Sequence, residues 1–524
     1  MGNEMKYQPN CPNKSVKITI PNMLEYVKIS QAFAFEMAKK VGFKNEEELN
    51  QVEIAIEEAV TNVIKHAFEK NERSTFDIIC TELDVGLKII IKEKGLPFDP
   101  KLFPKYSLPD SLNTDGDMKS LSSEGLGLHL MKNLMNEVSF HNLGAEGKEI
   151  HMIKYLPGVN IDEYKARTNT DTNAFENEKA KNKDLVAVIS EKINYSVRRM
   201  KEEEAIEVSK GAYKSHGYTF FDDNIYFPDK LVELNKKEQL ISIVAVSDKE
   251  EFMGHVAFFY PYVGASIAEL TFAFVNPEYR SQGCLKKLTE CLFTTPKKYP
   301  LVGAYAYSVT NHLFTQKALI KYDFLDCGIE LATSPASWHF KGIDGDTSQR
   351  ITVALGFRYM NQPKSLNLYP PSHHLEMIKK LYHNIKANDH HYLTDKNKTP
   401  KFEKEDSKLE VVLHSAEGSV EIFIYEYGSN ILKEIKLLLR NLCVQQMASI
   451  TLFLKLEDPT TAIITSEFEK MGFFFSGILP ASSIGDALIL QYLNNINFDY
   501  SKVQLLTDIA KETLNYIKKC DPNG

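Results

Sequence analysis

The stretch QVEIAIEEAVTNVIKHAF at residues 51–68 decides the fold that we expect for the first part of the chain. Its apolar residues recur at helical spacing and form one broad arc, which predicts an amphipathic helix with one buried face. Glu58, Asn62 and His66 follow at intervals of four residues, so they form a narrow stripe along the edge of that arc. Taken alone, the stripe favours a structural role, in which Asn62 bonds a neighbouring backbone group and Glu58 is solvated.

Two glycine motifs follow this helix in an order that favours nucleotide binding. KEKGLPFDP (92–100) ends a predicted strand with Glu93 and Gly95, where a carboxylate can bind an exocyclic amine and glycine lets a base approach the backbone. SEGLGLHLMKNLMNEV (123–138) then opens a helix with Gly-x-Gly, whose free N–H groups suit phosphates. Each motif is weak by itself, and their order carries the prediction.

In this order the motifs resemble the N, G1 and G2 boxes of the GHKL ATPases. The PFDP variant and the closing strand GKEIHMIKYL (147–156) resemble the anti-sigma-factor serine kinases within that family. The resemblance implies an α/β sandwich, the Bergerat fold, with ATP and Mg²⁺ as ligands. It makes Asn62 the Mg²⁺ ligand, Glu58 the general base, and Glu93, where the family normally has Asp, the adenine contact. The implied nucleotide-binding residues are Asn62, His66, Glu93, Gly95, Gly125, Gly127 and Leu128.

A second segment in which a predicted strand is followed by a glycine loop is VNPEYRSQGCLKKL (275–288). A predicted strand here delivers Gly283 to the start of a helix, and the N–H groups of that helix end, with Arg280 nearby, would suit a pyrophosphate. As a bare pattern the loop favours a simple capped turn.

In its context this loop resembles motif A of the GNAT N-acetyltransferases, and SVTNHLFTQKALIKYDFLDCG (308–328) resembles the segment that follows motif A. The resemblance covers about residues 186–332 and implies acetyl-CoA as cofactor. Glu269 is then the carboxylate that deprotonates an amine. Tyr322 is out of register with the family's general acid, so we expect it in the core. The implied acetyl-CoA contacts are Val275, Arg280, Gln282, Gly283 and Leu285.

Residues 459–495 resemble the last half of the same domain, but no glycine loop precedes them, so we expect a degenerate, structural unit. Asp486 is expected to cap a strand entrance. The histidine pairs lack nearby Cys or acid ligands in a helical register, which favours solvated or core histidines over a metal site. These histidines are His373, His374, His390 and His391.

The chain of 524 residues exceeds the size of one hydrophobic core, so we predict an α+β multidomain protein. A polar segment at 101–121 fits a lid over the phosphates. The predicted parts are a GHKL domain (1–157), a linker (158–184), a GNAT-like domain (185–345), and a crossover segment with a degenerate GNAT-like domain and a C-terminal helix (346–524).

Composition excludes several classes of protein. The net charge of −8 offers no electrostatic footprint for nucleic acid, and no apolar run is long enough for an ordinary membrane span. The seven cysteines are scattered and have no CxxC spacing, so neither a disulfide framework nor a zinc motif is indicated. We therefore expect a cytoplasmic protein.

The resemblances imply an ATP-binding signalling protein, either a serine/threonine kinase of the anti-sigma-factor type or an ATP-dependent switch, fused to an acetyl-CoA-binding N-acyltransferase-like module. Two alternatives stay open at this point, namely an N-acetyltransferase that ATP binding regulates and a non-catalytic, partner-binding regulator. The expected partners are an anti-anti-sigma (STAS-like) protein or a sigma factor, and a second copy of the chain in a homodimer.

Overall fold

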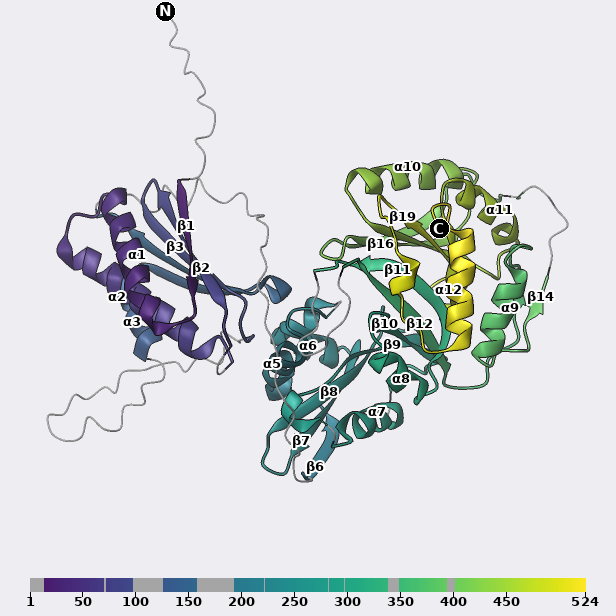
Figure 1. Cartoon of the computed structure of the whole chain (residues 1–524), viewed down its shortest axis with the longest axis horizontal. Coiled ribbons are helices and arrows are strands. Elements are labelled where there is room, and N and C mark those ends of the chain that lie inside the picture. The colour runs from purple at the N-terminus through teal and green to yellow at the C-terminus, as the bar shows by residue number, and fades with distance from the viewer. Residues whose placement is uncertain are drawn as a thin grey trace, which may run out of the picture. The chain divides into compact units, whose positions relative to one another are not determined.

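The chain folds into two compact units in the computed structural model (Figure 1). The first unit contains the N-terminal domain with Glu203–Lys214 and Asp223–Lys230, and the second contains Ser190–Glu202, Ser215–Asp222 and Leu231–Gly524. The predicted linker and lid lie outside the described residues. Those residues are 14–69, 72–97, 126–157, 193–220, 222–280, 282–295, 297–337, 348–393, 400 and 402–524.

The N-terminal domain is an α/β sandwich, which confirms the fold expected for it. Its five strands form an antiparallel sheet in the order β1-β2-β3-β5-β4, and helices cover one face of that sheet (Figure 1). The strands are β1 (Ser15–Pro21), β2 (Thr75–Leu83), β3 (Gly86–Glu93), β4 (Glu137–Asn142) and β5 (Lys148–Tyr155). The helices are α1 (Val27–Val41), α2 (Glu46–His66) and α3 (Leu126–Leu134).

Helix α2 forms where the apolar arc predicts it. The side chain of its N-cap residue, Asn45, accepts a hydrogen bond from the Glu47 N–H at 3.0 Å, which satisfies one of the unpaired donors of the first turn. Acidic residues occupy that turn and Lys65 and His66 the last one, as the helix dipole favours. The buried face consists of Leu49, Val52, Ala55, Ile56, Ala59, Val60 and Val63.

The second unit is built on one continuous 12-stranded sheet, and its first seven strands run in the order β6-β7-β8-β9-β10-β12-β11. Strand β12 lies between β10 and β11, so the predicted boundary at residue 345 falls before the last strand of this GNAT-like part. The strands are β6 (Tyr195–Arg199), β7 (Leu240–Ser247), β8 (Phe252–Phe259), β9 (Ile267–Val275), β10 (Gly303–Val309), β11 (Leu325–Ser334) and β12 (Ile351–Tyr359). The helices of this stretch are α7 (Cys284–Thr294) and α8 (Phe314–Ile320), and residues of α5 (Ala205–His216) and α6 (Pro228–Lys236) are divided between the two units.

The remaining five strands repeat the order of the last five strands of that pattern. Their order, β15-β16-β17-β19-β18, matches β8-β9-β10-β12-β11 strand for strand, with a helix inserted at the same two places. This confirms the degenerate GNAT-like unit. Its strands are β15 (Lys408–His414), β16 (Ser419–Glu426), β17 (Ser449–Lys455), β18 (Phe474–Ser482) and β19 (Gly485–Leu493). Its helices are α10 (Ile431–Val444), α11 (Pro459–Lys470) and α12 (Asp508–Cys520), and the crossover before it carries β13 (Asn367–Leu368), α9 (Leu375–Asn384) and β14 (His391–Tyr392).

The two halves of the large sheet meet at β11 and β18, a junction that we call the seam. The strands pair antiparallel at a single register, Gly328 opposite Gly477. A Cβ on Gly477 would collide with Gly328 Cα and would lie 2.6 Å from the Cys327 carbonyl oxygen, whereas a Cβ on Gly328 would meet nothing closer than 3.3 Å. The strands therefore approach closely enough to pair because residue 477 has no side chain.

We predict that Gly477→Ala lowers the free energy of unfolding of the second unit by about 2–3 kcal/mol, because the new methyl group forces the two backbones apart. The matched variant Gly328→Ala, on the facing strand, should cost less than about 1 kcal/mol. Thermal unfolding followed by calorimetry measures both. Equal losses for the two variants would contradict this account of the seam.

Candidate functional site

The predicted N-box stripe occupies one edge of α2. Glu58 and Asn62 are half-buried and His66 is exposed, while the neighbouring Ala59 and Val63 are buried. The half-buried positions allow an acid and an amide to face a ligand without losing all contact with water.

The structure brings the end of α2 together with the predicted G1 box. The Leu96 N–H donates to the carbonyl oxygen of Ala67, the C-cap residue of α2, at 2.5 Å. A Cβ on Gly95 would collide with the same carbonyl group. Gly95 is thus needed for close packing of the two motifs, which places the stripe and the end of β3 side by side.

Glu93 makes its strongest contacts with the protein itself. Its Oε1 lies 2.6 Å from Lys148 Nζ, and both side chains are 5 % exposed. The Gly95 N–H donates to Oε2, and Lys148 also donates to the Leu96 carbonyl oxygen. Burial raises the pKa of Glu93, and the ammonium group of Lys148 opposes that rise. Contact between Glu93 and adenine stays a prediction.

Sequence reasoning missed Lys148. In the antiparallel register of β3 and β5, Glu93 is the last residue of β3 and lies directly opposite Lys148, the first residue of β5. The signal was available as a basic residue at the first position of the predicted closing strand.

The G2 box is described in part. Gly127 and Leu128 lie in the first turn of α3, which begins at Leu126, so the glycine loop leads into a helix as expected. Gly125 and the lid at 101–121 lie outside the described residues.

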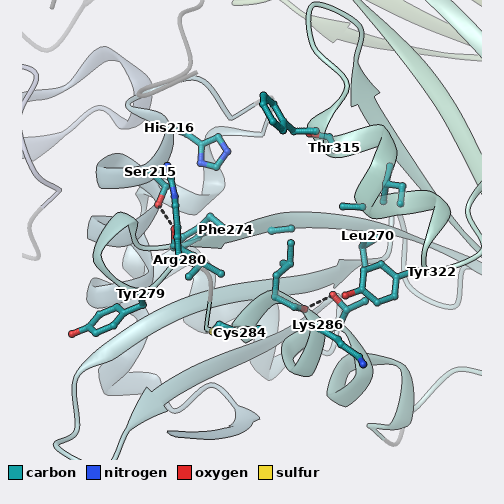
Figure 2. A pocket seen from close by; sticks show the side chains of 18 residues that line it. Ser215, His216, Leu270, Phe274, Tyr279, Arg280, Cys284, Lys286, Thr315 and Tyr322 are labelled. Atoms are coloured by element: carbon teal, nitrogen blue, oxygen red, sulfur yellow. Dashed lines mark hydrogen bonds between the residues drawn. The ribbon is translucent and has the colours of Figure 1, made fainter. Parts of the chain in front are cut away.

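A second candidate site is a cavity of about 480 Å³ in the GNAT-like part (Figure 2). The end of α5, strand β9, the start of α7 and helix α8 supply its walls. Of the five residues predicted to contact acetyl-CoA, the cavity wall includes Val275, Arg280, Gly283 and Leu285. The rest of the lining is Ser215, His216, Leu270, Ala273, Phe274, Tyr279, Cys284, Lys286, Thr289, Phe314, Thr315, Ala318, Leu319 and Tyr322.

Gln282 does not line this cavity. Its side-chain oxygen accepts the Ile193 N–H at 3.3 Å, and its carbonyl oxygen accepts the Tyr195 hydroxyl at 3.2 Å. The structure therefore separates Gln282 from the other four predicted residues and gives its side chain a contact with the segment leading into β6.

The amino end of α7 borders the cavity. Gly283 is its N-cap residue with φ 72°, a left-handed conformation, and a Cβ there would meet no atom within 4 Å. Glycine is favoured at this position by its backbone conformation and not by a lack of space. The first N–H groups of a helix have no partner inside it, so they and Arg280 give this end of the cavity a positive potential.

Strands β9 and β10 separate beside the cavity. They are parallel and pair only where Ile267–Glu269 faces Gly303–Tyr305. Farther along, β9 carries a bulge opposite β8 at Phe272, whose φ is 53°. Beyond Glu269 the backbone of β9 therefore has no ladder partner on its β10 side, and we call this unpaired stretch between the two strands the slot.

Glu269 lies at the point where this slot begins. Leu270 lines the cavity, so the alternation of side chains along β9 directs Glu269 to the opposite face of the sheet. Burial raises the pKa of Glu269 to about 8, and the carboxylates of Asp222 and Glu421 add to the rise. A carboxyl group with this pKa can take up a proton near neutral pH.

Tyr322 lies between the core and the cavity. It is half-buried and packs against the hydrophobic core, as expected, and it also stands on the cavity wall, where Figure 2 shows it near Leu270. Burial raises the pKa of its phenol group.

Two further predicted positions have structural contacts. Asp486 Oδ1 accepts the Ala481 N–H at 2.9 Å across the β18–β19 turn, and Oδ2 accepts the Tyr382 hydroxyl at 2.7 Å. His390 Nδ1 accepts the Leu366 N–H at 3.2 Å, and His391 is exposed.

Within the described ranges, no helix is long and apolar enough to cross a membrane.

The N-terminal domain matches known proteins in sequence. Residues 20–154 match the model of the histidine kinase-like ATPase domain. The serine-protein kinase RsbW of Bacillus subtilis is 29 % identical over 158 residues, which are 30 % of this chain and 96 % of that protein. RsbW of Staphylococcus epidermidis is 32 % identical over 142 residues, which are 27 % of this chain and 86 % of the relative.

Solved structures of acetyltransferases were also found to be similar. The match to the ribosomal-protein-S18-alanine N-acetyltransferase of Escherichia coli covers 32 % of this chain and 96 % of that enzyme's chain, with 11 % sequence identity and a TM-score of 0.26. An N-acetyltransferase of Staphylococcus aureus covers 32 % and 99 %, with 15 % identity and a TM-score of 0.26.

The order of the nucleotide-binding motifs, the α/β sandwich and the coverage of RsbW agree with one another. The N-terminal domain is an ATP-binding domain. Through this domain, the chain belongs to the family of histidine kinase-like ATPases that includes the serine-protein kinases RsbW.

Proposed function

We propose that the N-terminal domain is a protein kinase that binds Mg-ATP and transfers the γ-phosphate to a serine of a partner protein. The observation that carries this proposal is the half-buried pair Glu58 and Asn62 on α2, packed beside the end of β3 in a domain whose relatives are serine-protein kinases. Asn62 would hold Mg²⁺ between the phosphates. Glu58 would accept the proton of the serine hydroxyl as its oxygen attacks phosphorus and ADP leaves.

The partner that would receive the phosphate is an anti-anti-sigma protein of the STAS type. The second proposed partner is a sigma factor, which the kinase would hold or release. The kinase would act as a homodimer. His66, Gly125, Gly127 and Leu128 complete the proposed nucleotide site, and Glu93 with Gly95 would face the base.

Two substitutions on α2 separate binding from transfer. Asn62→Ala should weaken Mg-ATP binding at least tenfold in calorimetry, because a metal ligand is lost. Glu58→Gln should keep ATP affinity within about twofold and lower phosphate transfer to a STAS-type protein by about 10²–10⁴, the usual contribution of a general base. Glu53→Gln, also half-buried on α2, is the matched control and should change neither quantity.

ATP affinity that is equal in wild type and Asn62→Ala would overturn the proposed metal site. Binding without any transfer by the wild type would favour an ATP-dependent regulator that captures its partner without phosphorylating it.

We propose a second activity for the GNAT-like part, the transfer of an acyl group from acyl-CoA to an amine. The cavity at the start of α7 favours it, because the helix end and Arg280 suit the pyrophosphate of acetyl-CoA. The pantetheine arm would enter the slot between β9 and β10. The amine nitrogen would attack the thioester carbonyl, the C–S bond would break, Glu269 would take the amine proton, and the CoA thiolate would leave.

The groups around Glu269 favour a cationic amine as the acceptor. Asp222 and Glu421 both act electrostatically on Glu269, and Glu421 acts also on Glu330, which is buried and has a pKa of about 7. A protonated amine gains from these carboxylates, whereas an anionic acceptor would be repelled. ATP binding by the first domain could then regulate an N-acetyltransferase, which is the alternative function that the sequence leaves open.

Acetyl-CoA binding tests the cavity. Arg280→Gln should weaken the affinity about tenfold or more, because one charge-assisted contact with phosphate contributes about 1.5–3 kcal/mol. Gln282→Ala, in the same loop but outside the cavity, should leave the affinity within about twofold. Calorimetry with acetyl-CoA measures both, and equal effects of the two substitutions would contradict the assignment.

The pH dependence of transfer tests Glu269. The group must be deprotonated to act as a base, so kcat/KM should rise with pH, reach half its maximum near pH 8, where the pKa of Glu269 lies, and level off above that pH. The acceptor should be an amine that stays unprotonated across the range. Glu269→Gln should lose this pH dependence and about 10²-fold in rate. An unchanged profile in the variant would exclude Glu269 as the base.

A further inference from the structure

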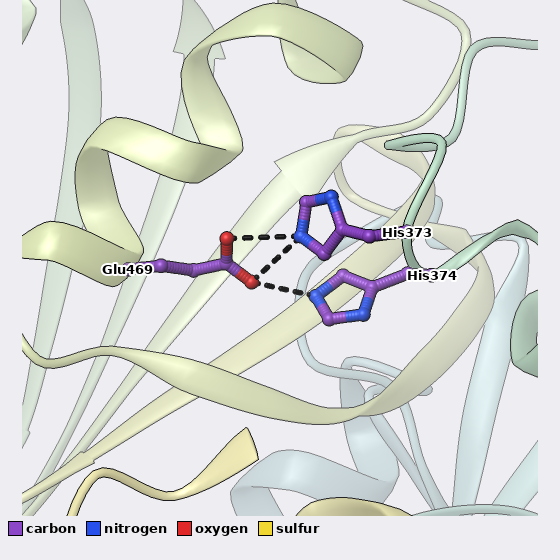
Figure 3. Close-up of side chains that lie close together, drawn as sticks. All are labelled: His373, His374 and Glu469. Carbon is purple, nitrogen blue, oxygen red and sulfur yellow. Dashed lines mark hydrogen bonds and ion pairs between the residues drawn. The ribbon is translucent and has the colours of Figure 1, made fainter.

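Two histidines and a glutamate converge beside the degenerate GNAT-like unit (Figure 3). His373 precedes α9, and His374 is the N-cap residue of that helix, while Glu469 lies in the last turn of α11. His373 Nε2 lies 3.0 and 2.9 Å from the two carboxylate oxygens, and His374 Nε2 lies 2.7 Å from Oε1. The three ligand atoms all lie within 4.8 Å of one another, and among the described residues no other such group occurs.

Tyr516 on α12 contacts both histidines. Its hydroxyl donates to the His373 carbonyl oxygen at 3.0 Å, and its oxygen lies 2.8 Å from His374 Nδ1. The contact with Nδ1 orients the His374 ring, so that its Nε2 faces the Glu469 carboxylate at 2.7 Å. Both imidazoles therefore present Nε2 to the same carboxylate group.

The cluster is partly enclosed by the fold. The side chain of His374 is 1 % exposed and that of Glu469 is 24 % exposed. The His374 ring also packs against Phe475 and Tyr516, with centroids 4.9 and 5.8 Å away. A second imidazole, that of His373, faces the same carboxylate, and one dication would satisfy all three groups at once.

We propose that His373, His374 and Glu469 bind one divalent transition-metal ion of the Zn²⁺ type, through Nε2 of each histidine and a carboxylate oxygen. Imidazole and carboxylate are the ligands that such ions take, at about 2.0–2.2 Å. The ligand atoms need to move apart by only a few tenths of an ångström to enclose an ion at these distances. A second hydrogen bond at the other ring nitrogen is usual for metal-bound histidines, and the contact of His374 Nδ1 with the Tyr516 hydroxyl can supply it.

The ion would join segments that are far apart in the chain. His373 and His374 belong to the crossover at the start of α9, Glu469 to α11, and Tyr516 to α12, which packs against β11 and β18. His373 is 47 % exposed, so the fourth position of the ion faces water. We assign the ion a structural role, in which it holds the crossover segment to the degenerate GNAT-like unit.

The test uses the full-length chain, stripped with a chelator and then titrated with Zn²⁺ against a chromophoric competitor. Wild type should bind one more equivalent than His373→Asn and Glu469→Gln, with at least 100-fold higher affinity at that site. Zn²⁺ should also raise its unfolding temperature. His383→Asn changes an exposed histidine on the same helix and should behave as wild type. Circular dichroism checks that each variant is folded.

X-ray absorption of the Zn²⁺-loaded wild type needs no variant and should show two imidazole ligands and an oxygen shell. Equal numbers of equivalents and equal affinities in wild type and both ligand variants would overturn the proposal. So would a wild-type absorption spectrum without imidazole scattering. In either case the cluster is a protonated histidine–glutamate ion pair.

Discussion

The carboxamide of Gln491 holds the two halves of the large sheet together. This side chain of β19 is wholly buried; its Nε2 donates to the Leu331 carbonyl oxygen at 2.7 Å, and its Oε1 accepts the Leu331 N–H at 2.8 Å. The amide thus supplies the two bonds that a neighbouring strand would give. It is needed because β11 and β18 pair only at Gly328 and Gly477. Without it, two buried backbone groups would lose their partners, at a cost of about 1–3 kcal/mol each.

A chain of paired strands connects the seam with the strand that lines the cavity at the start of α7. Strand β11 pairs with β12, β12 pairs with β10, and β10 leaves β9 after Tyr305 to open the slot. Ile267 and Tyr305, at the start of the slot, belong to the same hydrophobic core as Ile450 and Leu488 of the degenerate GNAT-like unit. The degenerate GNAT-like unit therefore shares its hydrophobic core with β9 and β10. Glu330 adds a polar contact across the seam, accepting hydroxyl groups from Tyr307 at 3.0 Å and Thr451 at 3.2 Å.

The sequence could predict what depends on neighbours along the chain. Helix α2, the stripe of Glu58 and Asn62, and the left-handed Gly283 follow from local spacing and backbone preference.

Contacts between distant segments could not be found in this way. Gln282 bonds Ile193, 89 positions away, and Glu469 meets His374 across 95 positions. Helical register relates only residues three or four positions apart, so the sequence around His373 and His374 gives no sign of the acid that lies beside them in the fold. The place of β12 in the sheet is another contact between distant segments, since its partners β10 and β11 both precede the turn-rich segment at which the boundary was predicted.

The longer acid at position 93 is explained by its partner. Lys148 stands opposite on β5, and Glu93 reaches it at 2.6 Å in a place that excludes water from both side chains. A buried charge pair gives little net stability, but loss of one member leaves an uncompensated charge and is costly. The two residues must therefore change together. Lys148 and the Gly95 N–H both bond the carboxylate, so they fix its orientation. An Asp at this position would be one methylene shorter, and the Lys148 ammonium would lose its close contact. The longer acid at position 93 is thus coupled to Lys148, the first residue of the closing strand.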